Sequence, residues 1–423
     1  MLLITIDALR ADHLTCLGYS KRITPNLDHL ASGGALFKQA ISVSHMTPTS
    51  FIPLFTSTYP LMNGGWFDIS KRGITLTEVL KAHGYHTGAF LSNPWLSSYY
   101  GYHKGFDVFN NSIPERGLLY GLLDRVLSVR LNPPFTGVRE LNKKAITWLH
   151  DNRDDFFLWL HYMDVHGPYG LLRNIASLLH SFPRRSASRT VDINRHIDLY
   201  DAQIRYEDKM FGSLLHTLTE LDILKDTLVV VTADHGQQFM EHGYYGHHSG
   251  LYDELIHVPL IIVGPGLKSR TITQQISLLD LAPTILDIVG IEKPKTFLGD
   301  TLLGLMRESG TEGGRLGAIS ETDVPLVTSR LRGNQKRLDA KRRVISFRTA
   351  KWKYIYTEGG QDELYCLETD LGERENLIDA EPETATELRS KIMAHIQFEE
   401  RKAARDDGII KAKIRKLKDS GKL

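Results

Sequence analysis

The stretch TLVVVTADHG, residues 227–236, sets the fold that the sequence predicts. Its first seven residues are apolar, Thr or Ala and indicate a buried strand, and Asp234, His235 and Gly236 follow directly. Similar short apolar runs occur at 2–6, 87–92, 156–163 and 258–264. Segments with helical periodicity alternate with these runs. This alternation predicts an α/β fold, a large and mainly parallel sheet sandwiched by helices.

The chain divides into four predicted parts. Residues 1–305 form a catalytic domain, and 306–342, rich in Gly, Arg, Lys and Ser with weak periodicity, form a linker or mobile loop. Residues 343–400 contain two antiparallel strands and a helix, which predicts a small C-terminal α+β subdomain. Residues 401–423 are a basic helical tail with nine Lys/Arg against three Asp/Glu. The tail is either a solvated terminal helix or a weak contact with an anionic membrane surface or partner.

Composition excludes several classes. The chain has 423 residues, 42% of them hydrophobic and 24% charged, which is ordinary for a globular protein. A formal net charge of +1 gives no reason to expect nucleic acid as a partner. Two cysteines are too few for a disulfide framework or a Cys-rich metal site. No signal peptide or transmembrane run is recognisable, so the expected location is cytoplasmic.

Three carboxylates follow predicted strands. Asp7, Asp164 and Asp234 each stand at or just past a strand end, in a turn or next to polar residues. The carboxyl ends of strands form the ligand crevice of an open α/β sheet. Carboxylates gathered there would repel one another unless a cation joins them. The sequence therefore predicts a metal site at this edge.

Histidines make the predicted site a mixed one. Asp234 and His235 are adjacent, and Asp7 completes a carboxylate, carboxylate and imidazole set that suits Zn or Mn. His247 and His248 follow in the same loop. The alternative is that these histidines only form hydrogen bonds within loops and bind no metal.

Two further motifs supply candidate chemistry. In HYMDVHGPYG, residues 161–170, His166 lies in a loop stiffened by proline, although a His hydrogen-bonded in a tight turn would look the same. In HMTPTSFIPLFTS, residues 45–57, Thr49 or Ser50 can cap a helix, which leaves Thr47 unexplained. A hydroxyl at a helix N-terminus next to a metal can become a nucleophile.

The chain resembles the sulfatase family of the alkaline phosphatase superfamily. The segments that carry the resemblance are LLITIDALRADHLTCLGY, ITPNLDHLASGGALFKQA, TLVVVTADHGQQFMEHG, LYDELIHVPLIIVGPG and RTAKWKYIYTEGGQDELYCLETDLGERENL. They run from the first strand into the C-terminal subdomain. The resemblance implies a large α/β domain followed by a small antiparallel sheet packed with a helix.

This sequence differs from the sulfatase motifs at the positions of the nucleophile and of the metal ligands. The resemblance places Thr47 where sulfatases carry a Cys or Ser that is oxidised to formylglycine, and threonine cannot yield that aldehyde. Phe51 stands in place of the motif's Arg. Ala8 replaces the second Asp of the family's first motif, and His235 replaces an Asn. An all-oxygen calcium site would thereby become a mixed oxygen and imidazole site, with Ca still an alternative.

The Asp, Thr, Asp and His set resembles that of the superfamily's phosphodiesterases, phosphoethanolamine transferases and lipoteichoic acid synthases. The resemblance implies Asp7, Thr47, Asp234 and His235 as metal ligands, with Thr47 also the nucleophile. It implies His166 and His247 as catalytic residues that contact the phosphate. Further members of a second metal or substrate site would be Asp164, His166, His247 and His248.

The sequence and the resemblance leave four possible functions. The first is metal-dependent hydrolysis of phosphate mono- or diesters through Thr47, and the second is hydrolysis of sulfate esters. The third is phosphotransfer to envelope lipid or polymer headgroups, which the missing membrane segment disfavours. The fourth is an inactive homologue that only binds an anion. The expected substrates are small-molecule, lipid or polymer esters.

Overall fold

A computed structural model describes most of the chain. The described residues are 1–62, 68–69, 73–112, 136–167, 192–247, 250–307, 315–323 and 342–419, with side chains up to Lys402. His248 lies outside them, as do most of 306–342 and the side chains of the basic tail. No helix among the described residues is both long enough and apolar enough to cross a membrane.

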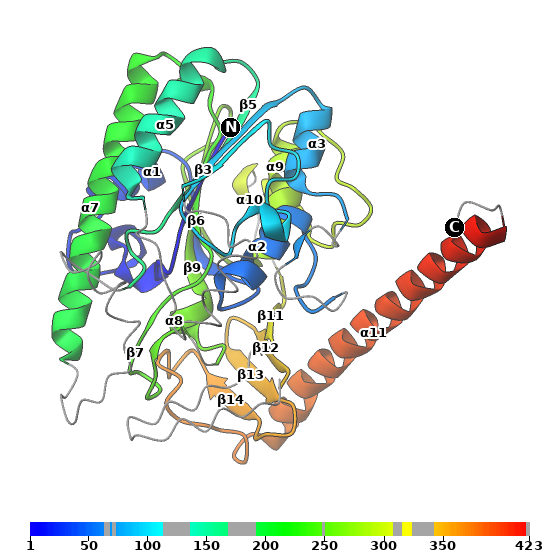
Figure 1. The fold of residues 1–423 in the computed structure, drawn as a ribbon. Helices are drawn as coiled ribbons and strands as arrows, with labels where there is room; N and C mark the ends of the chain where they lie inside the picture. The colour runs from blue at the N-terminus through cyan, green and yellow to red at the C-terminus, as the bar shows by residue number, and fades with distance from the viewer. Residues whose placement is uncertain are drawn as a thin grey trace, which may run out of the picture.

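An eight-stranded sheet forms the centre of the molecule (Figure 1). From one edge to the other its strands are β10 (Arg270–Ser277), β2 (Ala35–Ile41), β9 (His257–Val263), β6 (Val229–Ala233), β1 (Leu2–Ile6), β5 (Phe156–Tyr162), β3 (His86–Leu91) and β4 (Val108–Asn111). All pairs are parallel except those of β9, which runs antiparallel to β2 and β6. The predicted mixed, mainly parallel sheet is confirmed. The strand β9 follows β6 without a long crossover helix, which is why it runs the opposite way.

The register of the central strands aligns their carboxyl ends. Ile6 of β1 pairs with Tyr162 of β5 on one side and with Ala233 of β6 on the other. Residues that follow these three strands therefore emerge at one edge of the sheet. This alignment is the structural basis of the candidate site.

Helices cover both faces of the sheet, as predicted (Figure 1). One face carries α1 (Pro25–Ser32), α5 (Val138–Asp151) and α7 (Ile193–Glu220), and the other carries α2 (Thr47–Thr56), α3 (Leu76–Ala82), α9 (Leu281–Ile288) and α10 (Leu303–Arg307). Single 3-10 turns occur at Ala11–His13, Thr15–Leu17, Ser98–Tyr100, Leu224–Asp226 and Leu278–Asp280. The central strands β9, β6, β1 and β5 are mostly apolar, as expected for strands with both faces buried.

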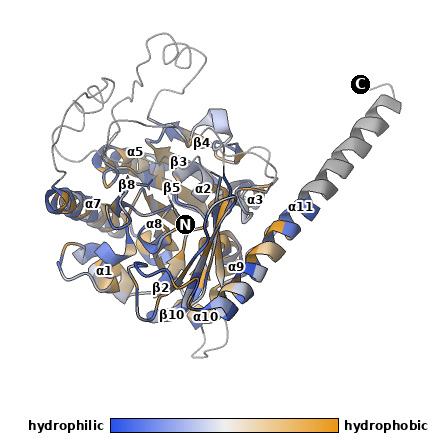
Figure 2. Cartoon of the chain, turned by 90° about the horizontal axis from the view of Figure 1, so that it is seen from below, coloured by the Kyte–Doolittle hydropathy of each residue, from blue (hydrophilic) through white to orange (hydrophobic). Residues whose placement is uncertain are grey.

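A small antiparallel sheet follows near the C-terminus, as predicted. Its strands are β11 (Ala318–Thr322), β12 (Val344–Arg348), β13 (Trp352–Thr357) and β14 (Glu363–Cys366). The long helix α11 (Pro382–Asp419) packs on β12 and β13 and then extends away from the body (Figure 1). The part of α11 that is coloured in Figure 2 carries both hydrophilic and hydrophobic residues. The strand β11 lies inside 306–342, which the sequence predicts to be a linker or mobile loop. That prediction is wrong for Ala318–Thr322. This strand pairs with β12 at a distance in sequence that local composition cannot reveal.

Apolar and ionic contacts join the small sheet to the large domain. A buried cluster combines Leu251 and Leu255 with Val344 and Ile355 of the small sheet. Beside it, the fully buried ammonium of Lys353 forms ion pairs with two carboxylates, those of Asp253 at 2.9 Å and Glu373 at 2.8 Å. The short helix α8 (Asp253–Ile256) thus supplies both the apolar and the charged contacts.

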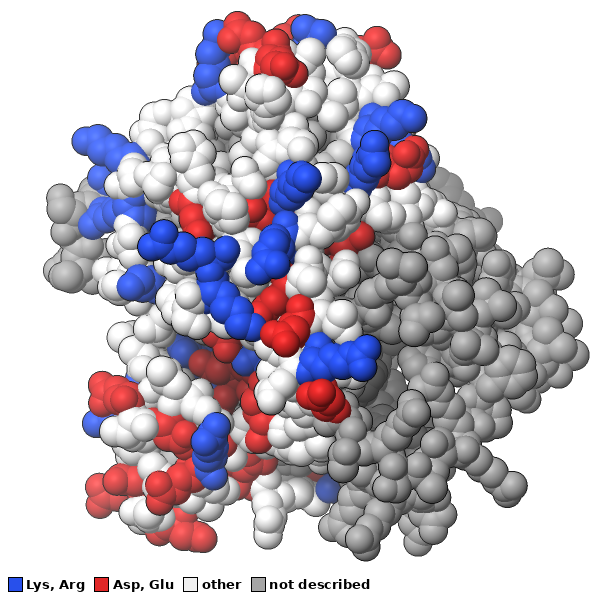
Figure 3. Space-filling model, turned by 90° about the vertical axis from the view of Figure 1, so that its left-hand side faces the viewer, with Lys and Arg blue, Asp and Glu red and all other residues white. Residues whose placement is uncertain are grey.

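Charged side chains of both signs share the outer surface. On the face drawn in Figure 3, Lys and Arg side chains and Asp and Glu side chains are both widely spread, and neither sign covers the face alone. This mixture agrees with the net charge of +1.

Candidate active site

Two buried carboxylates face each other where β1 and β6 end. Asp7 follows Ile6, and Asp234 follows Ala233, and neither side chain is exposed. One carboxylate oxygen of Asp234, Oδ1, accepts hydrogen bonds from the backbone N–H groups of Ala8 and His235, at 3.2 and 2.9 Å. These two bonds fix the side chain and leave Oδ2 facing His235 Nε2 at 3.5 Å.

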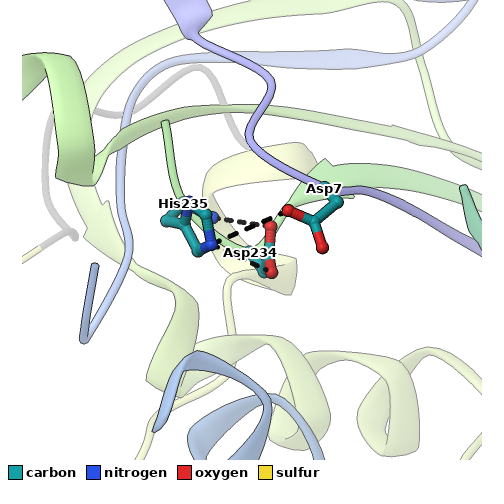
Figure 4. A group of neighbouring side chains, drawn as sticks. All are labelled: Asp7, Asp234 and His235. Carbon is teal, nitrogen blue, oxygen red and sulfur yellow. Dashed lines mark hydrogen bonds and ion pairs between the residues drawn. The ribbon is translucent and has the colours of Figure 1, made fainter. Parts of the chain in front are cut away.

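His235 completes a group of three possible ligands. We call Asp7, Asp234 and His235 the strand-end group, and Figure 4 shows their side chains pointing toward one another. One ligand atom from each lies within 4.8 Å of the other two. Nδ1 of His235 donates to the carbonyl of Gly236 at 2.9 Å, since a carbonyl can only accept. The other ring nitrogen, Nε2, therefore presents its lone pair to the carboxylates.

The strand-end group fits a divalent cation. Asp7 Oδ1 and Asp234 Oδ2 have no hydrogen-bond partner among the described residues. They lie 3.8 and 3.5 Å from His235 Nε2. Buried polar atoms almost always have a partner, so two such oxygens beside an imidazole lone pair mark a place for an ion.

The pKa directions support this conclusion. Burial, together with the negative charge of Asp7, raises the pKa of Asp234 to about 7. Burial also acts on Asp7, but the neighbouring imidazoles, chiefly that of His166, hold the pKa of Asp7 below its ordinary value. Burial lowers the pKa of His235, which keeps its imidazole neutral. Without a cation one of the two carboxylates would retain a proton near neutral pH, and a divalent ion would take the place of that proton.

Thr47 brings its hydroxyl to the same point. It is the first residue of α2, and Met46 occupies the N-cap position. The hydroxyl oxygen lies 3.3 Å from Asp7 Oδ2 and 3.3 Å from His235 Nε2. The residues predicted to cap this helix do not do so, because the helix begins before them. Instead, Thr49 and Ser50 donate their hydroxyls to backbone carbonyls.

Two residues that hold Asp7 were not assigned a role from the sequence. Asn93 donates its side-chain amide to Asp7 Oδ2 at 3.0 Å, and His161 Nε2 lies 3.3 Å from the same oxygen. The hydroxyl of Thr5 fixes the other ring nitrogen of His161 at 2.9 Å. Asn93 stands two residues past the end of β3, so the strand-end rule that selected Asp7 could also have found it. His161 lies inside β5, where only the paired strands reveal its neighbour.

The structure brings His166 and His247 to this site together. Their Nε2 atoms are 3.0 Å apart, and the ring of His247 lies over that of His235 with centroids 4.5 Å apart. The antiparallel pair β7 (Gln238–Phe239) and β8 (Tyr245–Gly246) returns the chain from His235 to His247. Nδ1 of His166 faces the carbonyl of Gly167 at 2.6 Å, so this nitrogen carries the hydrogen.

Asp164 and His242 contact other elements of the chain. The carboxylate of Asp164 accepts from the backbone N–H of Val138 at 2.8 Å and thus faces the N-terminus of α5. It is not among the clustered ligand atoms of the strand-end group. His242, in the same loop as His247, instead contacts Glu254 at 2.7 Å and the carbonyl of Glu373 at 3.0 Å. It connects the loop to the small subdomain.

Comparison with known proteins gives the family. The family model "Sulfatase" matches residues 1–291. Arylsulfatase K of Mus musculus is 32% identical over 203 residues, which is 47% of this chain and 35% of that protein. Delta 4,5-hexuronate-2-O-sulfatase of Bacteroides thetaiotaomicron is 31% identical over 225 residues, which is 52% of this chain and 42% of that protein. The match thus spans less than half the length of either relative.

Solved structures agree on the fold. The phosphonate monoester hydrolase of Agrobacterium radiobacter superimposes with a TM-score of 0.73 and 20% identity, over 94% of this chain and 95% of that chain. Sulfatase-family enzymes generally use a divalent metal ion, and the strand-end group offers it ligands. The chain belongs to the sulfatase family.

Proposed function

We propose that the protein hydrolyses sulfate esters by nucleophilic attack of Thr47. The observation that carries this proposal is the position of the Thr47 hydroxyl, 3.3 Å from both Asp7 Oδ2 and His235 Nε2. It also lies at the first residue of a ten-residue helix, where backbone N–H groups favour developing negative charge. The names of the curated relatives, both sulfatases, support sulfate as the group transferred.

The first step forms a bond between Thr47 Oγ1 and the ester sulfur. The bond from sulfur to the leaving alcohol breaks, and the product is a threonine sulfate. The hydroxyl proton passes to Asp7 Oδ2, the acceptor toward which the hydroxyl points in the structure. Asn93 and His161 hold this carboxylate in place, so the acceptor needs no rearrangement.

His166 and His247 serve the leaving group. Because Nδ1 of His166 donates to a carbonyl, its Nε2 accepts the hydrogen that His247 carries on Nε2. When the pair holds one further proton, it can give that proton to the departing alkoxide. In the second step, water attacks the sulfur of the threonine sulfate. Water gives one proton to the imidazole pair, the bond between the sulfur and Thr47 Oγ1 breaks, and Thr47 Oγ1 takes back the proton held by Asp7 as sulfate leaves.

We propose Zn or Mn as the ion, since one of the three donors is an imidazole nitrogen, and a hard oxygen-seeking ion such as Ca suits the set less well. When bound, such an ion supplies positive charge that balances the carboxylates and lowers the pKa of a neighbouring hydroxyl. Asp7 Oδ1, Asp234 Oδ2 and His235 Nε2 are the atoms that would hold it. The second-metal role predicted for His166 and His247 stays a prediction.

The proposed substrate is a small-molecule sulfate ester. The Bacteroides relative is named for a hexuronate 2-O-sulfate, which supports a sulfated sugar as the class to test first. Contact with lipid or a membrane surface through the basic tail, and the cytoplasmic location, remain proposals from the sequence alone.

Hydrolysis of phosphate mono- or diesters is the second candidate. The sequence ranks it first, and the curated relatives favour sulfate instead. One observation still supports phosphate: Thr47 stands where sulfatases carry the residue converted to formylglycine, and a threonine nucleophile with a mixed ligand set resembles the phosphoryl-transfer branch of the superfamily. The same atoms would attack phosphorus in place of sulfur.

The test compares three esters. The full chain is assayed with p-nitrophenyl sulfate, p-nitrophenyl phosphate and bis(p-nitrophenyl) phosphate, with Zn, Mn and Ca added in turn. Thr47→Ala should lower turnover by about 10³-fold or more, because the nucleophile is gone, whereas Thr47→Ser should retain activity. The control is Thr49→Ala, which removes a buried hydroxyl of the same helix that donates to a carbonyl.

Each outcome decides between the candidates. Turnover of the sulfate that depends on Thr47 supports the proposal. Turnover of phosphate esters alone would replace it with the second candidate. If no ester is cleaved with any metal, the inactive anion-binding homologue becomes the better account.

A further inference from the structure

A second group of ligand-type side chains lies outside the active site, between the small sheet and α11. Glu321 belongs to β11, and His395 and Glu399 stand four residues apart on one face of α11. We call these three residues the α11 cluster. All are buried, with 0%, 7% and 4% of their surface exposed. One ligand atom from each lies within 4.8 Å of the other two.

The imidazole of His395 stands between the two carboxylates. Its Nε2 lies 3.0 Å from Glu321 Oε2 and 3.6 Å from Glu399 Oε1. The other oxygen of Glu321 accepts from the backbone N–H of Leu61 at 2.6 Å, and the other oxygen of Glu399 pairs with Arg343. The outer oxygens thus have partners, and the inner ones are directed at His395.

A single proton does not satisfy this arrangement. Nε2 of His395 can carry one hydrogen, and the closer oxygen, Glu321 Oε2, takes it. Glu399 Oε1 then has no hydrogen-bond partner among the described residues, although it is buried. A lone buried carboxylate oxygen is rare without an ion or a water beside it.

The spacing suits a tetrahedral ion. With zinc bonds of about 2.0–2.1 Å, neighbouring donors of a tetrahedral site stand about 3.3 Å apart. The two distances from His395 Nε2, 3.0 and 3.6 Å, lie on either side of this value. Arg343 would hold a ligating carboxylate from its outer side, as residues around metal ligands commonly do.

We propose that Glu321, His395 and Glu399 form a structural zinc site that fastens α11 to the rest of the protein. A cavity of about 360 Å³, lined in part by Tyr59, Arg315 and His395, adjoins the cluster and would admit the ion and a water as fourth ligand. The ring of Tyr59 packs edge-on against that of His395 with centroids 4.4 Å apart. Through Leu61 and Tyr59 the site joins α11 to the segment that follows α2.

The site is tested by zinc stoichiometry. The full chain is stripped with chelator, loaded with zinc, freed of excess ion and analysed by mass spectrometry for zinc per chain. Glu399→Gln should lose one zinc equivalent relative to the unaltered protein, and Glu400→Gln, the exposed neighbour on the same helix, should lose none. Asp234→Asn, in the strand-end group, should not affect the zinc held by the α11 cluster.

A second variant separates a metal site from an ion-pair network. Glu399→His replaces the carboxylate with another zinc ligand, so it should keep the zinc equivalent and the rise in melting temperature that zinc produces. An ion-pair network would lose its pairing with Arg343 and gain nothing from zinc. The proposal is overturned if the unaltered protein and Glu399→Gln hold equal amounts of zinc. It is also overturned if zinc raises the melting temperature of both by the same amount. Cobalt in place of zinc provides an independent check: in the Asp234→Asn background a tetrahedral cobalt absorption band should be present, and adding Glu399→Gln should remove it.

Discussion

The strand-end group and the α11 cluster contain the same kinds of side chain but are built differently. In the strand-end group, Asp7 and Asp234 are placed by the aligned carboxyl ends of β1 and β6. In the α11 cluster, helical spacing aligns His395 and Glu399, and a distant edge strand supplies the third residue. Parallel strands thus bring carboxylates together as a consequence of the sheet, whereas the α11 cluster depends on how two separate elements pack.

The charges around the two groups also differ. A partly buried arginine, Arg343, pairs with one carboxylate of the α11 cluster. The two carboxylates of the strand-end group contact imidazoles and an amide, and two of their oxygens lack hydrogen-bond partners among the described residues. We therefore expect the strand-end group to depend more strongly on a bound cation than the α11 cluster does.

Among the residues proposed to hold a cation in the two groups, Asp234→Asn should have the largest effect. The change removes one negative ligand and should lower both metal affinity at the strand-end group and ester turnover by more than about 100-fold, the upper range for residues that only support ligands. Metal content and turnover measure this directly. Asp226→Asn, an exposed position just before β6, is the matched control. Retention of both properties in Asp234→Asn would show that this group is no metal site.

Asn93→Ala should have an intermediate effect. Its amide donates to Asp7 Oδ2, so its removal should lower metal affinity by about 10–100-fold without emptying the site at high metal concentration. Competition titration with a zinc indicator measures the affinity. Asn152→Ala is the control, because that amide donates to the carbonyl of Trp148 near the end of α5. An unchanged affinity would mean that Asp7 is not a ligand.

The smallest expected effect is on the free energy of unfolding and comes from His242. This residue is bound by hydrogen bonds and not by a metal, so it serves as a comparison for both groups. Its two ring nitrogens face the carboxylate of Glu254 and the carbonyl of Glu373, which both only accept, so the imidazole must carry two hydrogens. Although burial acts the other way, the carboxylate of Glu254 raises the pKa of His242 above its ordinary value of 6.5. The stability from this proton is complete below pH 6.5 and is lost as pH rises through the raised pKa.

Chemical denaturation between pH 6 and pH 9 tests this prediction. The free energy of unfolding should fall by about 1 kcal/mol with rising pH, the scale of one charge-assisted hydrogen bond. His242→Gln should flatten this dependence, and added zinc should leave it unchanged. A dependence that zinc removes would mean that His242 responds to the metal site and is not held by a proton alone.

Much of the site could be predicted from local pattern. Asp7, Asp234 and His235 are found because apolar runs reveal buried strands, and the residue after a parallel strand must emerge at the sheet edge. Asp164 follows the same rule, yet its carboxylate turns to α5. Position after a strand fixes where a residue emerges but not where its side chain points.

The sequence by itself determined the mixed, mainly parallel sheet, the family, and the strand-end carboxylates, because each depends on periodicity or on residues close together in the chain. Only the tertiary structure decided that His247 packs against His235 while His242 contacts Glu373 of the small subdomain. The reason is that the pairing of β7 with β8 sets the path of that loop. The tertiary structure also decided the contact of His161 with Asp7, the inclusion of β11 in the small sheet, and the meeting of Glu321 with α11. These contacts join residues far apart in sequence, and their formation depends on packing, which no local pattern encodes.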